Sequence, residues 1–228
     1  MAKKYVVCDS GSLITFTSSC SADLLYFFKE KFKIQFVIPP GVEEEVVLYP
    51  LRKAIKKYMQ SALRLKRAIE DDVINVIEID ELADEREHLL NVGNNILYAR
   101  GKPLHLVDIG ETEMIVLAKE IGAETVILDE RTTRMMIEAP FKLKEHLEEE
   151  LGVNIMVNKA NLTEFSKYST GLSAFRSSEL LILGYENGFL DKYGEHAKEM
   201  LEAALYAFRF SGCSISFNEI TSYLRWAE

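Results

Sequence analysis

Two aspartates, Asp9 and Asp129, each come directly after a short apolar segment of this 228-residue chain. The segments, residues 5–8 and 125–128, are rich in β-branched side chains and are typical of buried parallel strands. In a parallel α/β sheet, ligands bind outside the carboxyl ends of the strands, near the point where the strand order reverses. We therefore expect both carboxylates at that edge of a sheet. The alternative for either residue is a side-chain cap on the following turn, a common role of Asp.

A third acidic candidate, Glu111, stands at the start of a predicted helix. The pattern Asp108-x-x-Glu111 has the form of a capping box, which would explain both residues structurally. Glu111 also shares a helical face with the apolar Met114 and Ile115, which favours an inward position in the first turn. Spacing alone leaves capping and function equally open for Glu111, and it makes Glu113 the weaker candidate.

A fourth candidate comes from the triplet Glu43-Glu44-Glu45, which follows Pro39-Pro40-Gly41. Acids in the first turn of a helix are favoured by the helix dipole by about 0.3–1 kcal/mol each, and this accounts for most of the triplet. Glu45 shares a helical face with Val42 and Leu48. We therefore choose Glu45 over Glu44 as the acid that turns toward the sheet edge.

Carboxylates that meet without a histidine or cysteine between them form a site with oxygen ligands only. Such a ligand set favours Mg²⁺ or Mn²⁺ over Zn²⁺. A hard cation in such a site can activate water and neutralise the charge of a phosphodiester during hydrolysis. The four histidines show no ligand spacing. The acids therefore indicate metal-dependent chemistry on a phosphate ester.

The elements that must position these acids alternate along the chain. Predicted strands cover residues 5–8, 36–38, 73–79 and 125–128, with a fifth over 153–157, and residues 9–12 form a loop. Predicted helices cover residues 21–32, 41–48, 51–69 (with Pro50 in its first turn), 80–97, 108–121, 131–137, 142–151 and 178–189. This alternation implies a mostly parallel sheet with helices on both faces. Residues 195–226 are predicted to form an amphipathic tail interrupted at Ser211-Gly212.

The charge of the chain argues against general affinity for nucleic acid, because 27 Lys and Arg stand against 36 Asp and Glu. The segment 51–69 nevertheless carries basic residues without any acid, among them Lys53 and Lys57, which could contact phosphates. Tyr58 lies among them and could stack on a base. The alternative is a solvated helix face whose cations pair with acids such as those of Glu70-Asp71-Asp72.

The cysteines and the apolar segments bear on the cellular location. Three cysteines without C-x-x-C spacing argue against a disulfide framework and fit a reducing cytoplasm. We find no signal segment and no apolar stretch of roughly 18 residues, so we expect a cytoplasmic protein that does not span a membrane.

With these residues in place, the chain resembles the PIN-domain family of metal-dependent ribonucleases, which includes toxins of toxin–antitoxin pairs and rRNA-processing nucleases. The matching blocks occur in the family's order and cover residues 6–14, 37–45, 110–118 and 126–131. The resemblance implies a catalytic acidic cluster of Asp9, Glu45, Glu111 and Asp129, a metal held by Asp9, Glu111 and Asp129, and substrate contacts by Ser10 and Arg131.

The fold implied by the resemblance is a three-layer α/β/α sandwich with a mostly parallel sheet of about five strands. This PIN-like domain would cover residues 1–190, and residues 191–228 would form a C-terminal helical extension. The implied activity is that of an endoribonuclease that depends on Mg²⁺ or Mn²⁺. The alternative is a catalytically inactive PIN-like module that binds RNA or a protein partner.

The expected partner is RNA. An antitoxin-like or other protein partner and a homodimer remain open alternatives, and no membrane is involved. A phosphatase or kinase that uses Asp9 is a further alternative, but phosphohydrolases with an aspartyl nucleophile require a second Asp where this chain has Gly11.

Overall fold

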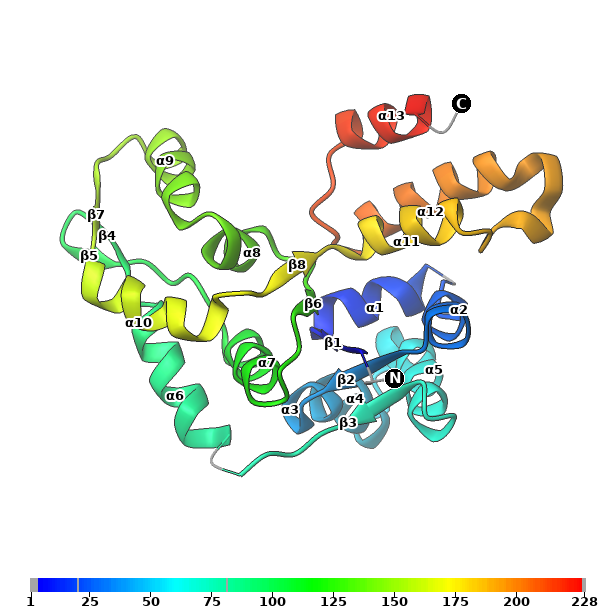
Figure 1. Ribbon diagram of the computed structural model, residues 1–228, viewed down its shortest axis with the longest axis horizontal. Helices are drawn as coiled ribbons and strands as arrows, with labels where there is room; N and C mark the ends of the chain where they lie inside the picture. The colour runs from blue at the N-terminus through cyan, green and yellow to red at the C-terminus, as the bar shows by residue number, and fades with distance from the viewer. Residues whose placement is uncertain (1–3, 20, 81, 227–228) are drawn as a thin grey trace.

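A five-stranded, all-parallel sheet lies at the centre of the molecule (Figure 1). The structure, a computed structural model, describes residues 4–19, 21–80 and 82–226. The strands are β1 (Lys4–Cys8), β2 (Ile34–Ile38), β3 (Ile74–Val76), β6 (Thr125–Ile127) and β8 (Ser173–Phe175), in the order β3-β2-β1-β6-β8. The predicted α/β fold with a parallel sheet of about five strands is thereby confirmed.

Side chains of the central strands alternate between two hydrophobic cores, one on each face of the sheet. Val6 and Cys8 of β1 point into the first core, whereas Val7 points into the second. The first core is covered by α1 (Ser10–Ser18), α2 (Asp23–Phe32), α5 (Lys56–Glu70), α11 (Ser177–Glu186), α12 (Ala197–Ser211) and α13 (Phe217–Trp226). The second is covered by α6 (Leu82–Gly93), α7 (Ile109–Glu120), α8 (Arg131–Glu138), α9 (Pro140–Leu151) and α10 (Lys159–Ser169).

One helical stretch after β2 differs from the prediction. It runs through α3 (Pro40–Glu43), the π-helical turn η1 (Glu44–Leu48) and α4 (Tyr49–Arg52), and Pro50 lies inside it rather than at the start of the next helix. Proline lacks a backbone N–H, and the π-helical turn just before it has already widened the hydrogen-bond ladder. The chain breaks later, where Ala54 adopts a left-handed φ of 51°, and α5 starts at Lys56.

A second, three-stranded antiparallel sheet lies at the left edge of Figure 1. Its strands are β4 (Leu97–Ala99), β5 (Lys102–Pro103) and β7 (Ile155–Val157). The prediction that residues 153–157 form the fifth strand of the main sheet is therefore wrong, because β7 pairs with β4 and the fifth place belongs to β8. A short apolar segment carries no information about its partner strand, so the sequence could not distinguish the two sheets.

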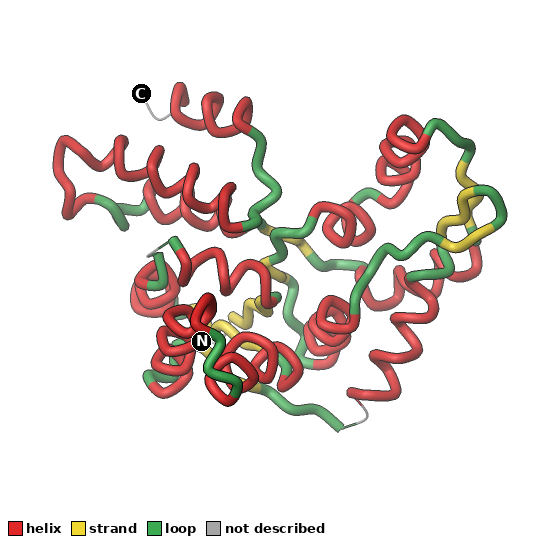
Figure 2. The backbone as a smooth tube through the Cα atoms, turned by 180° about the vertical axis from the view of Figure 1, so that it is seen from behind, coloured by secondary structure: helices red, strands yellow, loops and turns green. Residues whose placement is uncertain are grey.

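The C-terminal helices follow the predicted tail and pack on the first core. A 3-10 helix, η2 (Asp191–His196), leads into α12, which ends at Ser211, and Gly212 then turns the chain with a φ of 120°. Leu205 and Phe208 of α12 are fully buried in the core that also contains Val6. Figure 2 shows α11, α12 and α13 together on one side of the central sheet, opposite the small sheet. The domain boundary at residues 190 and 191 stays a prediction.

Two further expectations concern the membrane and the cysteines. Among the described residues, no helix combines the length and the apolar character needed to cross a bilayer. Cys8 and Cys213 are buried and free, whereas Cys20 lies outside the described residues.

Arg176, at the start of α11, connects three parts of the chain. Its side chain is almost completely buried, and Nη1 donates to the carbonyl of Ser214 at 3.0 Å and to Glu219 Oε1 at 2.9 Å. Nη2 donates to Glu179 Oε1 at 2.9 Å. The guanidinium therefore holds α13 and its preceding loop against α11.

Replacing Arg176 by methionine keeps most of the apolar stem and removes these bonds. We expect Arg176→Met to lower the free energy of unfolding by about 2 kcal/mol, because hydrogen bonds to charged groups contribute about 1.5–3 kcal/mol and the partner glutamates can regain water. Urea denaturation followed by circular dichroism measures the change. Arg225→Met, at an exposed site on α13, is the control, and equal stability of the two variants would contradict this role.

Candidate active site

Asp9 lies at the carboxyl end of the central strand β1, where the strand order reverses between β1 and β6. Its N–H donates to the carbonyl of Ile127 at 3.1 Å, and its Oδ1 accepts from Ser12 N at 2.7 Å. The second bond makes Asp9 the N-cap of α1, so the capping alternative is confirmed. The expected loop over residues 9–12 is wrong, since α1 starts at Ser10. Asp9 is both the residue after β1 and the N-cap of α1, so no loop separates the strand from the helix.

An open cavity of about 470 Å³ begins at this cap and is lined mainly by acids. Its lining comes from the ends of four segments that are far apart in the chain, and includes Asp9, Ser10, Glu45, Asp108, Glu111 and Glu130. Gly11 lies beside Asp9 Oδ2, which a Cβ at that position would approach to 3.1 Å. The structure thus brings together Asp9, Ser10, Glu45 and Glu111, as expected from the sequence.

The side chains of the glutamate triplet point in different directions, because consecutive residues of a helix lie on different faces. Glu45 lines the cavity, and its Oε2 lies near Gly110, where an added Cβ would approach it to 3.9 Å. Glu44 instead pairs with Arg52, with Oε1 and Nη2 2.5 Å apart. The structure therefore places Glu45, not Glu44, at the acidic cavity.

Glu111 combines the two roles that the sequence left open. Its Oε2 accepts from the backbone N–H of Asp108 at 2.8 Å, which is one half of a capping box, and the same side chain lines the cavity. Burial is the main cause that raises the pKa of Glu111. Glu113 lies elsewhere, because its buried carboxylate faces Gly41 and lies 3.9 Å from Arg86 Nη1.

Asp129 lies next to the cavity rather than on its lining. It is 3% exposed, and both carboxylate oxygens accept from Ser177, Oδ1 from the backbone N–H and Oδ2 from Oγ, each at 2.8 Å. The following residue, Glu130, lines the cavity and caps α8 by accepting from Thr133 N at 2.7 Å. Sequence reasoning missed Glu130 and Asp108 as cavity residues, although acids at two predicted helix starts were an available signal.

The predicted substrate contacts divide into two groups. Ser10 lines the cavity, whereas Arg131 is exposed at the first position of α8, next to Glu130, and Lys53 and Lys57 are exposed around the start of α5. Part of the basic segment pairs as the alternative predicted, in the ion pairs Lys66–Glu70, at 2.8 Å, and Arg67–Asp71, at 3.4 Å. In the described part of the chain, no carboxylate lies within ion-pair distance of Lys53, Lys56 or Lys57.

The electrostatics of the site centre on Asp9, which is 7% exposed. Its pKa is raised to about 7, mainly by burial and also by the negative charges of Asp129 and Glu111, while the hydrogen bonds from Ser12 act in the opposite direction. A buried carboxylate among like charges is costly to ionise unless a cation is near. The site therefore favours either a proton on Asp9 or a positive ion beside it.

The donor set fits a hard divalent cation in chemistry and charge. Among the described residues that line the cavity, oxygen atoms are the only side-chain donors, and none of these residues is a histidine or a cysteine. The described residues contain no group of three or more acidic, histidine or cysteine side chains close enough together to hold a metal on their own. Mg²⁺ commonly keeps several waters and is bound by one or two carboxylates together with substrate phosphates. Asp9 with Glu45, Glu111 or Glu130 would meet that requirement.

Comparison with known families agrees with this arrangement. A family model described as a PIN domain matches residues 5–140, which is more than half of the chain. The match includes Asp9, Glu45, Glu111 and Asp129 and ends before β7 and the C-terminal helices. Comparison with curated proteins and with solved structures finds no match.

The raised pKa of Asp9 predicts how stability depends on pH when no metal is present. Because the folded-state pKa of about 7 exceeds the ordinary value of 3.8, the folded state keeps a proton that the unfolded state loses in this window. The free energy of unfolding should therefore fall as the pH rises from about 4 to 7, by up to about 4 kcal/mol. The pKa of Glu111 is also raised, so this residue contributes to the same pH dependence.

Asp9→Asn should remove this contribution and still accept the Ser12 N–H. In EDTA, we expect the variant to melt at a higher temperature than the wild type at about pH 8, with a smaller difference at about pH 5. Thermal denaturation at the two pH values measures both. If the difference in melting temperature between the two proteins is the same at both pH values, Asp9 is ionised in the folded state as well as in the unfolded state, and the prediction is wrong.

Proposed function

Since the chain belongs to the PIN-domain family, whose fold is of the nuclease type, we propose that it is a divalent-metal-dependent endoribonuclease that hydrolyses RNA phosphodiester bonds at the acidic cavity. One observation carries this proposal. Asp9, Glu45, Glu111 and Glu130 come from four separate segments and line a single cavity at the strand-order reversal. Three of these acids also cap helix starts, whereas Glu45 caps none, and all four carboxylates line the same cavity.

The hydrogen bonds of each acid indicate whether it binds the metal or positions another residue. Asp9 keeps Oδ2 beside the cavity while Ser12 holds Oδ1, so Asp9 is the leading metal ligand, with Glu45 and Glu111 around it. When bound, Mg²⁺ or Mn²⁺ supplies charge neutralisation for the phosphodiester and lowers the pKa of water. Asp129, whose oxygens are bonded to Ser177, acts through its negative charge and is a positioning residue.

The backbone around the cavity keeps these side chains in place before substrate arrives. The N–H groups of Ser12, Asp108 and Thr133 each hold one carboxylate oxygen, on Asp9, Glu111 and Glu130 respectively. Fixed donors and charges cost no reorganisation during the reaction. Ser10 lines the cavity, and the exposed Arg131 follows the cavity residue Glu130 at the start of α8, so both are candidates to contact a phosphate that enters the cavity.

The second candidate function is a catalytically inactive module that binds RNA or a protein partner. The observation in its favour is that Asp129 has both oxygens bonded to Ser177 instead of facing the cavity. This alternative predicts that RNA binds equally well in EDTA and in Mg²⁺ and is not cleaved. Cleavage assays with matched binding measurements separate the two functions.

Neutralising the central acids should abolish cleavage without unfolding the protein. We expect Asp9→Asn to reduce the Mn²⁺-dependent cleavage rate of single-stranded RNA by about 100-fold or more, since outer partners of metal ligands alone account for 10–100-fold. Asp129→Asn should cause a smaller loss, because it acts through Asp9. Circular dichroism confirms folding. Full activity in both folded variants would eliminate the mechanism.

The adjacent glutamates Glu44 and Glu45 offer a matched pair for the role of the cavity. Glu45→Gln should weaken Mn²⁺ binding, measured by calorimetry, and lower the cleavage rate, each by about 10-fold. Glu44→Gln should change neither, because Glu44 faces Arg52. Equal effects of the two substitutions would show that only the total charge of the helix matters.

A further inference from the structure

A second, mostly apolar cavity of about 220 Å³ adjoins the acidic cavity. Its lining includes Ile14, Glu45, Val46, Tyr49, Ile55 and Tyr58, and we call it the tyrosine cavity. Glu45 lines both cavities, so they share one wall. The volume is below the ~300–1,000 Å³ typical of pockets for whole small molecules, and it suits a single planar ring.

The cavity lies at the break between α4 and α5. Ala54, with its left-handed φ, lies in this break, and Tyr49 of α4 and Tyr58 of α5 line the cavity from its two sides in the sequence. Tyr49 is 45% exposed and Tyr58 is partly buried. Tyrosine offers an apolar ring face and a polar hydroxyl, which suits a site that is apolar inside and open to water at its mouth.

Three lysines lie close in sequence to the tyrosine cavity, in a chain that is acidic overall. Lys53, Lys56 and Lys57 are exposed at the break, and the described residues place no carboxylate within ion-pair distance of them. The Lys57 Nζ lies 4.9 Å from the centroid of the Tyr58 ring. A partner that complements this surface carries planar rings and a negative backbone.

Single-stranded nucleic acid has that combination, because proteins bind it with a basic groove along the backbone and aromatic side chains against the bases. We propose that the tyrosine cavity binds one unpaired base of single-stranded RNA, next to the phosphate that occupies the acidic cavity, while Lys53, Lys56 and Lys57 contact the neighbouring phosphates. This inference rests on the proposed function. A base in a duplex presents no free face to the tyrosines, so the site selects single-stranded substrate.

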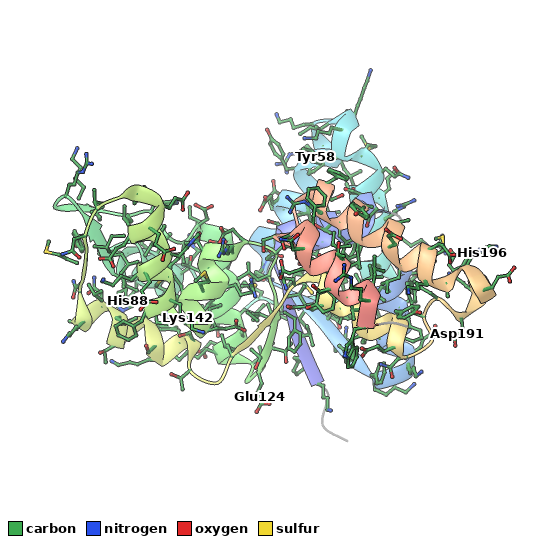
Figure 3. The ribbon with its side chains drawn as sticks, turned by 90° about the horizontal axis from the view of Figure 1, so that it is seen from above. Tyr58, His88, Glu124, Lys142, Asp191 and His196 are labelled. Carbon is green, nitrogen blue, oxygen red and sulfur yellow. The ribbon has the colours of Figure 1, made fainter. Side chains whose placement is uncertain are left out.

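The test measures RNA binding by the full chain in EDTA, where the proposed cleavage cannot occur. Fluorescence anisotropy with a short labelled single-stranded RNA gives Kd for the wild type, Tyr58→Ala, Tyr58→Phe and Tyr193→Ala. Tyr193 is the matched control, because it is exposed, carries Lys192 5.4 Å from its ring centroid, and belongs to η2. Figure 3 shows Asp191 and His196, which flank Tyr193 in the sequence, far from Tyr58.

We expect Tyr58→Ala to raise Kd about fivefold or more, the change that corresponds to stacking of one base on one aromatic ring. Tyr58→Phe should keep most of the affinity, and Tyr193→Ala should keep all of it. An RNA of the same length without bases should bind the wild type and Tyr58→Ala equally.

Two results would overturn the base-binding site. One is an unchanged Kd for Tyr58→Ala. This result is also expected if the tyrosine cavity binds a side chain of a partner protein instead of an RNA base. The other is a wild-type chain that does not bind the RNA, or binds it no better than the RNA without bases. Cleavage without dependence on Tyr58 would remove this inference and leave the nuclease proposal intact. RNA binding that depends on Tyr58 without any cleavage would support the base-binding site and contradict the nuclease proposal.

Discussion

The burial of Asp9 beside two other carboxylates is the constraint on which the rest of the structure depends. Asp9 is 7% exposed at the end of the central strand, and Asp129 and Glu111 both disfavour its ionised form. Charges in such a position are tolerated only where packing and hydrogen bonds elsewhere supply the stability. The two apolar cores on either side of the sheet provide that support, and donors such as Ser12 N–H hold the carboxylates in fixed directions.

The arrangement of helix starts explains how so much negative charge can gather at one edge of the sheet. Asp9 caps α1, Glu111 lies in the first turn of α7, and Glu130 caps α8. The positive ends of three helix dipoles therefore meet at the acidic cavity, each next to a carboxylate. Capping and function are thus not competing explanations for these residues. The same backbone N–H groups that need an acceptor fix the side chains that a cation would need.

Much of this architecture could be predicted from the sequence, because strands and helices of a parallel α/β sheet have distinct hydrophobic patterns. The strands around Val7, Val37 and Val126 and the acids that follow them were readable in this way. Contacts between segments that are distant in the chain could not be predicted from these patterns. The assignment of residues 153–157 to the wrong sheet and the contact between Asp129 and Ser177 both depend on tertiary neighbours. Glu130 was missed because its neighbour Asp129 fitted the strand-end pattern better.

The bond pair between Asp129 and Ser177 gives the C-terminal part of the chain a direct mechanical connection to the acids. Ser177 is the first residue of α11, beyond the residues 5–140 that match the family, and Arg176 just before it holds α13. A displacement of this helix start that breaks both bonds would leave a buried carboxylate without these two donors, next to the acid whose pKa its charge already raises. The environment of Asp9 is therefore set in part by a segment of the chain that lies outside the family match.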